Sequence, residues 1–185
     1  AATYDQSAAF QRRVGHELMS LLPDWQEKTV LDLGCGTGYF SEQIAKHGAQ
    51  VIALDLSEQM LEHARARCGD ALQYVSGDAE SLPFADNSVD VVFTSLALQW
   101  CNDLSVPLQE MKRVVRPGGT ILFSTLLDGS LYELKQAWSQ VDSRQHVNTF
   151  LTLKQVNLAL AQAGSANHHL ECQTLIERYP SALAL

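Results

Sequence analysis

The stretch Thr29-Val-Leu-Asp-Leu-Gly-Cys-Gly-Thr-Gly38 decides the fold of this chain. Its first five residues are apolar or β-branched except for Asp32, and they run directly into three glycines separated by single residues. Apolar residues then recur at helical spacing until Gly48. The pattern predicts a strand, a glycine turn and a helix. Glycine suits such a turn because it accepts positive φ and lets a ligand approach the backbone.

The glycine turn does not have the spacing of a dinucleotide-binding loop. The pattern G-x-G-x-x-G requires a third glycine at position 39, where Tyr39 stands. This disfavours an NAD-dependent dehydrogenase. The acid that begins the pattern, Asp32, suits a ligand with a cationic amino group better than one with a pyrophosphate. Taken alone, the glycines are equally compatible with a plain turn, so the interpretation depends on the strands that follow.

Two further apolar runs end in acids. The run Gln50–Leu56 contains Asp55 near its end, 21 residues after Gly34, which is close to the spacing of about 20 at which an acid meets ribose hydroxyls. The run from Leu72 to Ser76 leads into Asp78. Ligands of parallel sheets bind at the carboxyl ends of the strands. The sequence therefore predicts three carboxylates at one edge of a parallel sheet, beside the glycine turn.

These motifs resemble the class I S-adenosylmethionine (SAM) methyltransferases. The resemblance rests on Val30-Leu-Asp-Leu-Gly-Cys-Gly-Thr-Gly38, Ala53-Leu-Asp-Leu-Ser57, Gly77-Asp-Ala-Glu-Ser-Leu-Pro-Phe84 and Ser88-Val-Asp-Val-Val92, which occur in this order. It implies a doubly wound α/β fold with a mostly parallel sheet and helices on both faces. It also implies SAM as cofactor, S-adenosylhomocysteine as its product, and no metal. The cofactor contacts that it implies are Tyr4, Gln11, Asp32, Gly34, Cys35, Gly36, Gly38, Asp55, Leu56, Met60, Asp78, Ala79, Ser95, Leu96 and Gln99.

Several of these assignments have ordinary alternatives. Tyr4 and Gln11 are expected to contact the methionine end of the cofactor, and otherwise they are solvent-facing polar residues. Met60 follows the acid Asp55 by about one helical turn, which suits either core packing or contact with the adenine. Trp100, next to Gln99 at the end of a strand, suits a pocket wall better than a place in the core.

Composition predicts one globular domain and argues against nucleic acid as a partner. The chain has 185 residues, of which 46% are apolar and 18% charged, and its net charge is −8. No cationic excess is present to displace counterions from phosphates, although a local basic patch is compatible with that average. The four cysteines show neither C-x-x-C nor metal-ligand spacing, which favours free thiols and a cytoplasmic location. No apolar run approaches the roughly 18 residues of a membrane span, and the missing initiator methionine suggests a trimmed start.

The single methyltransferase domain, residues 1–185, divides into three predicted parts. Residues 1–22 are expected to form a helix that closes over SAM, and residues 26–126 to form the SAM-binding core. Residues 127–185 are expected to carry acceptor-side helices and a sixth strand. The class I fold normally has a seventh strand, for which no sequence remains, so we expect the C-terminal part to be missing.

Within the later part of the chain, four local patterns give specific expectations. Thr120–Leu126 should be the fifth strand, after a helix that ends before Pro117-Gly-Gly119. Ser130–Glu133 and Thr152–Gln155 each match a capping box that opens a helix. The apolar residues after the first box, from Leu131 to Val141, recur on one helical face. His168–Tyr179 should form the sixth strand.

A narrower resemblance points to a substrate class. The segments Tyr4–Arg12, Ser95–Cys101, Arg113–Gly118 and Ser124–Phe150 are similar to the malonyl-acyl-carrier-protein O-methyltransferases of biotin synthesis, the BioC family. The resemblance implies methylation of the free carboxylate of malonyl-acyl carrier protein or malonyl-CoA. A carboxylate is ionised at pH 7, so a general base is not required.

The acceptor site then needs groups that hold a carboxylate. Arg144 is the first candidate because its guanidinium offers two parallel donors, with His146, Asn148 and Trp100 as further positioning residues. The alternative for Arg144 is an exposed residue in a polar connection. An acidic carrier protein would require a local cationic surface, for which the basic residues between Lys112 and Arg116 are candidates.

Two other functions are compatible with the sequence. The motifs up to residue 126 would serve equally well in a methyltransferase that acts on a quinone precursor or a small carboxylic acid. A SAM-binding protein without catalysis would carry the same glycine turn and acids. Isotope transfer from labelled SAM, with each acceptor in turn, separates these possibilities.

Overall fold

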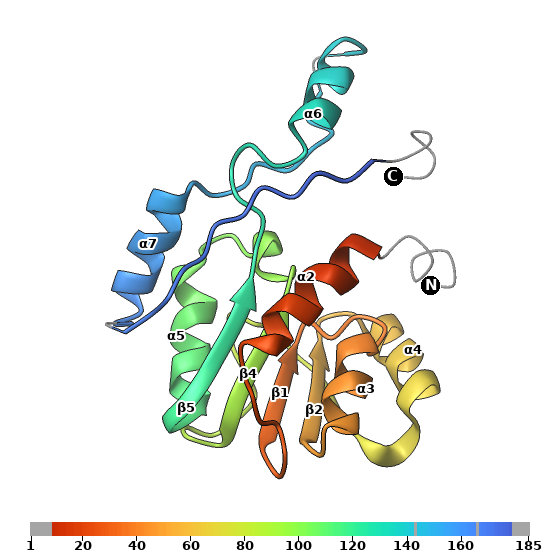
Figure 1. The fold of residues 1–185 in the computed structure, drawn as a ribbon, viewed down its shortest axis with the longest axis vertical. Coiled ribbons are helices and arrows are strands. Elements are labelled where there is room, and N and C mark those ends of the chain that lie inside the picture. The colour runs from red at the N-terminus through yellow and green to blue at the C-terminus, as the bar shows by residue number, and fades with distance from the viewer. Residues whose placement is uncertain (1–8, 143, 166, 179–185) are drawn as a thin grey trace.

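The computed structural model describes residues 9–142, 144–165 and 167–178 (Figure 1). The strands are β1 (Thr29–Leu33), β2 (Gln50–Asp55), β3 (Gln73–Ser76), β4 (Val89–Ser95) and β5 (Val115–Ser124). The helices are α2 (Ala9–Ser20), α3 (Tyr39–Lys46), α4 (Glu58–Cys68), α5 (Ser105–Val114), α6 (Tyr132–Ser139) and α7 (Leu153–Gln162). Two short 3₁₀ turns follow α4 and β4, η1 (Gly69–Ala71) and η2 (Leu98–Trp100).

The five strands form one sheet in the order β3-β2-β1-β4-β5, and every neighbouring pair is parallel. The chain moves outward from β1 in one direction to β3 and then returns to the other side of β1 to begin β4. The order therefore reverses between β1 and β4. At such a switch point the connections leave toward opposite sides, which opens a crevice at the carboxyl ends of the strands.

Helices cover both faces of the sheet, because successive side chains of a buried strand point to opposite sides. Val30 belongs to one buried cluster, with Leu18 of α2 and Ile44 of α3. Leu31, its neighbour on β1, belongs to another, with Leu108 of α5 and apolar residues of α7. Figure 1 shows α2 and α3 on one side of the sheet and α5 on the other. The predicted doubly wound α/β fold is confirmed.

The end of the first helix and both ends of the fifth strand differ from their predicted positions. Helix α2 begins at Ala9 and ends at Ser20, and residues 1–8, including Tyr4, lie outside the described part. Strand β5 begins at Val115, five residues before the predicted start, and ends at Ser124. Val115 already pairs with Val89, and the register then shifts along β5, so that Val91 pairs with Thr120. A side chain at Gly119 would lie 2.5 Å from the carbonyl oxygen of Asp90, so glycine here permits close strand pairing rather than ending it.

One of the two predicted capping boxes forms. Thr152 Oγ1 accepts a hydrogen bond from the amide of Gln155, and the Gln155 side chain accepts one from the amide of Thr152. The predicted box at Ser130 is wrong, because Leu131 occupies the cap position with φ 56° and makes no capping side-chain bond. The Ser130 amide instead donates to the carbonyl of Leu127 in a turn, which displaces its side chain from the capping position.

Residues 128–142 and 144–150, here called the arm, project beyond the carboxyl end of β5 (Figure 1). None of the α6 residues is buried, and the predicted apolar face is largely exposed, including Leu131, Trp138 and Val141. Helical periodicity indicated correctly that one side of α6 is apolar, but it could not indicate whether another element covers that side.

The predicted sixth strand is wrong for the residues that the structure describes. Residues 167–178 are extended but form no ladder with a neighbouring strand. A β-strand in a sheet requires hydrogen bonds to a partner strand, so local sequence alone does not make this segment one.

Candidate functional site

The glycine turn between β1 and α3 forms the floor of the site. Gly34, Gly36 and Gly38 all have positive φ, at 74°, 54° and 77°. At Gly34 a Cβ atom would lie 2.5 Å from the Cβ of Ala97, so the turn packs directly against the segment that follows β4. At Gly36 a Cβ would meet nothing within 4 Å. The backbone at Gly36 is therefore open to the approach of a ligand.

Asp32 is a buried carboxylate at the end of β1, with 2% of its surface exposed. Ser41 Oγ on α3 donates a hydrogen bond of 2.5 Å to its Oδ2. Burial raises the pKa of Asp32 to about 7; the nearby negative charge of Asp55 adds to the rise, and the Ser41 bond opposes it. A buried acid that is only partly ionised near neutral pH marks a place where a cationic ligand would be favoured.

Asp55 ties the glycine turn to the end of β2. Its Oδ2 accepts a hydrogen bond of 2.9 Å from the amide of Gly36, and its Oδ1 accepts one of 2.9 Å from the amide of Ser57. A carboxylate has about four lone-pair sites, so each oxygen keeps capacity for a ligand hydroxyl. Leu56, the next residue, is 73% exposed, and Met60 is half-buried on the first turn of α4.

Asp78 lies on the same edge of the sheet but is exposed. Its Oδ1 accepts a hydrogen bond from the amide of Glu80, and the amide of Gly77 donates to the carbonyl of Asp55. The pKa of Cys101, just after η2, is raised to about 11 by burial and by the charges of Glu80 and Asp78. The connection after β3 therefore reaches the segment after β4, with Ala79 packed against the core.

The segment after β4 is held by Ser124, a residue that sequence reasoning missed. Ser124 accepts two hydrogen bonds from the amide of Leu96, one at its carbonyl oxygen and one at its Oγ. Its Oγ also lies 3.1 Å from Ser95 Oγ. These contacts hold Leu96 at φ 52°, a conformation that a leucine rarely adopts and that turns the chain toward Gly34. The parallel register places Ser95 opposite Ser124, and this pairing is visible only in the structure.

Two glutamines present buried carbonyl oxygens. Gln99 Nε2 donates to the carbonyl of Leu96 at 2.6 Å, while its Oε1 is buried without a hydrogen-bond partner among the described residues. Gln11 Oε1, on α2, is likewise buried without a hydrogen-bond partner among the described residues. Orphaned buried acceptors are uncommon and call for a donor. Together with Asp32 and Asp55, they fit a ligand that carries hydroxyl donors and a cationic amine.

The predicted acceptor residues lie on two separate segments. Trp100 ends η2 and is 72% exposed, whereas Arg144, His146 and Asn148 are exposed residues of the arm. The His146 ring stacks on Trp138 at 4.1 Å, and its Nε2 lies 2.8 Å from Asp142 Oδ1. The structure thus gathers most of the cofactor candidates around the glycine turn and leaves the acceptor candidates on the arm and on η2.

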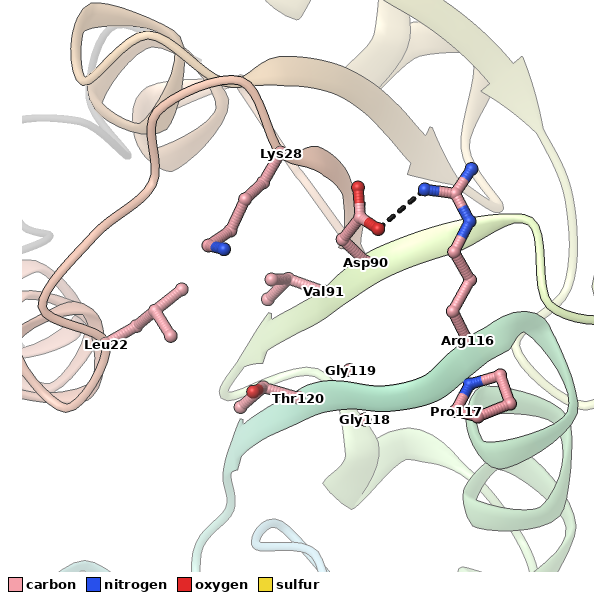
Figure 2. A pocket seen from close by; sticks show the side chains of 9 residues that line it. All are labelled: Leu22, Lys28, Asp90, Val91, Arg116, Pro117, Gly118, Gly119 and Thr120. Atoms are coloured by element: carbon pink, nitrogen blue, oxygen red, sulfur yellow. Dashed lines mark hydrogen bonds and ion pairs between the residues drawn. The ribbon is translucent and has the colours of Figure 1, made fainter.

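A cavity of about 220 Å³ lies at the opposite, amino-terminal end of the sheet (Figure 2). Figure 2 shows Arg116 reaching Asp90, with Lys28 on the other side of the cavity. Neither the glycine turn nor the acids Asp32 and Asp55 line this cavity. We place the site at the carboxyl end because the glycine turn, Asp32 and Asp55 meet there, and the segment after β4 that carries Gln99 packs against the turn.

The basic residues considered for carrier docking are engaged within the chain. Lys112 Nζ donates to the carbonyls of Ala163 and Gly164, beyond the end of α7. Arg116 donates to Asp90 and to two backbone carbonyls. Arg113 contacts Glu110, Asp86 and the carbonyls of Leu82 and Phe84. Lys112 and Arg113 thus fasten α5 to its neighbours, and Arg116 fastens the start of β5 to the start of β4, which argues against a shared docking surface.

Replacing Arg113 by methionine should lower the free energy of unfolding by about 2 kcal/mol. The change keeps the aliphatic stem but removes the guanidinium donors from the carbonyls of Leu82 and Phe84, and it leaves the Glu110 carboxylate with the Leu82 amide as its remaining donor. Urea denaturation measures the difference. Arg13→Met removes the ion pairs of a half-exposed side chain with Glu17 and Glu177 and should cost less than about 1 kcal/mol. Equal losses in the two variants would show that the Arg113 contacts stabilise no more than a surface pair.

Within the described residues, no cluster of three or more histidine, cysteine or acidic side chains is arranged to bind a metal ion. None of the described helices combines the length and apolar character that crossing a membrane requires.

Comparison with known proteins agrees with this geometry. Residues 31–123 match a family model described as a methyltransferase domain. The malonyl-[acyl-carrier protein] O-methyltransferase of Yersinia pestis is 48% identical over all of this chain and 68% of its own length. The enzyme of the same name from Serratia marcescens is 46% identical over all of this chain and 71% of its own length.

Solved structures place the fold in the same group. An S-adenosylmethionine-dependent methyltransferase from Mesorhizobium loti superposes with a TM-score of 0.69 at 29% identity, over 84% of this chain and 82% of that one. A putative methyltransferase from Haloferax volcanii, solved with its Trm112 activator, gives a TM-score of 0.73 at 26% identity, over 86% and 71%. This chain therefore belongs to the SAM-dependent methyltransferases, within the family of the malonyl-[acyl-carrier protein] O-methyltransferases.

Proposed function

We propose that this protein methylates the free carboxylate of malonyl-acyl carrier protein, giving a methyl ester in early biotin synthesis. The observation that carries the proposal is the 48% identity to a relative of that name, which extends over the whole chain and thus includes the arm. The site at the carboxyl end of the sheet supports it, because its acids and orphaned oxygens fit a cationic, hydroxyl-bearing cofactor.

The residues around the glycine turn fit SAM, which supplies a methyl group on a cationic sulfur when it is bound. Asp55 would accept the ribose hydroxyls while its amide bonds keep the turn in place. Exposed Leu56 and half-buried Met60 offer an apolar surface for the adenine. Asp32, Gln11 and Gln99 would favour the cationic methionine end. S-adenosylhomocysteine is the product that leaves this site.

The chain's own chemistry suits an acceptor that is already an anion. An ordinary side-chain carboxylate has a pKa near 4, and a malonyl carboxylate of similar acidity needs no base at pH 7. The thiols at the site are poor nucleophiles, because burial raises the pKa of both Cys35 and Cys101. The rate then comes from holding the reacting atoms in line, an effect worth up to about 7–11 kcal/mol. Methylation also removes a charge that an apolar pocket of a later enzyme would disfavour.

Arg144 would select the malonyl carboxylate, with His146, Asn148 and Trp100 positioning the acceptor. Arg144 lies on the arm, where its backbone amide donates a hydrogen bond to Asp142. Its guanidinium makes no hydrogen bond or ion pair with the residues that the structure describes, so it is available to a substrate carboxylate. Arg144→Ala should raise KM for malonyl substrates and spare SAM affinity, as measured by steady-state kinetics and by titration with SAM. Equal weakening of both would remove Arg144 from the acceptor site.

The test of the function is methyl transfer from labelled SAM to malonyl-acyl carrier protein, run beside malonyl-CoA and a quinone precursor. Transfer to the malonyl thioesters alone supports the proposal. Transfer to the quinone precursor favours the alternative acceptor class, and SAM binding without transfer to any acceptor favours a non-catalytic binding protein.

We also place the protein in the cytoplasm, where its four unpaired cysteines would remain reduced.

A further inference from the structure

A second cavity, of about 60 Å³, lies at the base of the arm. It is enclosed by the connection that leads into α6 and by the segment that returns toward α7. Its polar lining consists of Asp128, Ser130, Tyr132, Lys135, Asn148 and Thr149. The volume gives room for a few water-sized groups, which is the scale of a carboxylate or a phosphate.

The base of the arm is fixed on the protein, so the cavity is held open by backbone contacts. Leu127 and Leu151 form a parallel bridge, and the amide of Asp128 donates to the carbonyl of Leu151 at 2.9 Å. The amide of Ser130 donates to the carbonyl of Leu127 at 3.0 Å. The bridge and the Asp128 bond join the outgoing and returning parts of the arm at the cavity, and the Ser130 bond closes a turn within the outgoing part.

Lys135 contributes the positive charge of this cavity. It projects from the first turns of α6, is exposed, and has no ion pair or side-chain hydrogen bond with any of the described residues. Hydroxyl groups of Ser130, Tyr132 and Thr149 and the amide of Asn148 add neutral donors around it. Asp128 is the opposing feature, because its carboxylate lines the same cavity.

We propose that this cavity is an oxyanion subsite for the acceptor, in which Lys135 is the principal cation. The inference rests on the proposed function, whose substrate has two oxyanions, the malonyl carboxylate and the phosphodiester of the pantetheine arm. Both present several oxygen acceptors to an ammonium ion and to neutral donors. The cavity lies beyond β5, the strand next to β4, on the side of the crevice away from the cofactor acids.

Kinetics with three malonyl substrates distinguish the two oxyanions. Malonyl-acyl carrier protein and malonyl-CoA carry a phosphate, whereas S-malonyl-N-acetylcysteamine carries only the carboxylate. Lys135→Ala should raise KM about tenfold or more, with kcat nearly unchanged, since a hydrogen bond to a charged group is lost. A rise for all three substrates assigns the carboxylate to the subsite. A rise for the phosphate-bearing two alone assigns the phosphodiester.

Two variants serve as matched tests. Lys154→Ala removes an exposed lysine from α7 and should leave every KM unchanged. Asp128→Asn removes the negative charge from the cavity and should lower KM for the same substrates that Lys135→Ala affects. If neither Lys135→Ala nor Asp128→Asn changes any KM by more than twofold, the subsite is overturned.

A binding measurement tests the oxyanion subsite independently of the proposed methyl transfer. NMR titration of the protein with malonate, and separately with 4′-phosphopantetheine, should shift amide signals of the arm in the wild type but not in Lys135→Ala. Such shifts without methyl transfer to any malonyl thioester would reject the proposed function and retain the subsite. Transfer by the wild type without any shift that depends on Lys135 would reject the subsite alone.

Discussion

Replacing Asp32 by asparagine should make the ligand-free protein more stable above pH 7 and weaken its binding of SAM. Burial raises the pKa of Asp32 from 3.8 to about 7, so the folded state holds a proton that the unfolded chain releases near pH 4. The free energy of unfolding therefore falls as pH rises from about 4 to 7, by up to about 4 kcal/mol. An asparagine does not titrate and loses none of this stability.

Urea unfolding of both proteins between pH 4 and 8 measures the effect, and the two curves should diverge as pH rises. Asp90→Asn is a control of opposite sign. The Thr29 amide and Arg116 lower the pKa of Asp90, so its contribution is present near neutral pH and is lost as pH falls. Parallel curves for the wild type and Asp32→Asn would mean that Asp32 keeps an ordinary pKa.

The same carboxylate should couple SAM binding to proton release. If the cationic end of the cofactor lies near Asp32, binding favours the ionised form, and affinity should increase between pH 6 and 8. Calorimetry in buffers of different ionisation enthalpy should show up to about one proton released near pH 6. Binding by Asp32→Asn should be weaker and nearly independent of pH. Unchanged affinity in this variant would remove Asp32 from the cofactor site.

Replacing Asp55 by alanine should weaken SAM binding by at least about 100-fold. Two ribose hydroxyl bonds to a charged oxygen are worth about 3 kcal/mol or more together. The change also removes the acceptor for the amides of Gly36 and Ser57, so the glycine turn loses its attachment to β2. Isothermal titration with SAM measures the loss.

Asp55→Asn is a sharper test than the alanine variant. Both carboxylate oxygens face amide donors, and an asparagine can accept at only one of these positions. Its affinity should therefore resemble that of Asp55→Ala more than that of the wild type. Glu58→Gln removes an equal charge from the exposed first turn of α4 and should bind SAM normally. If Asp55→Asn keeps wild-type affinity, the two hydrogen bonds that the Asp55 carboxylate accepts from the amides of Gly36 and Ser57 do not position the cofactor.

Local sequence determined much of the site. The apolar runs and the glycines placed β1, β2 and the turn correctly, because each pattern concerns residues a few positions apart. Parallel pairing then brought Asp32 and Asp55 to one edge, as predicted. The box at Thr152 formed and the one at Ser130 did not, although both match the same pattern. The difference lies in the turn before Ser130, which depends on how the chain leaves β5.

Only the tertiary structure decided the properties that depend on residues far apart in the sequence. Asp32 acquires its raised pKa from its burial and from Asp55, while Ser41 on another element opposes the rise. Ser124 fixes Leu96 from 28 positions away, and the arm exposes an apolar face that periodicity identified without indicating whether another element covers it. A sequence pattern records which side chains follow one another. The solvent exposure of a carboxylate, and the charges beside it, depend on chain segments that meet only after folding.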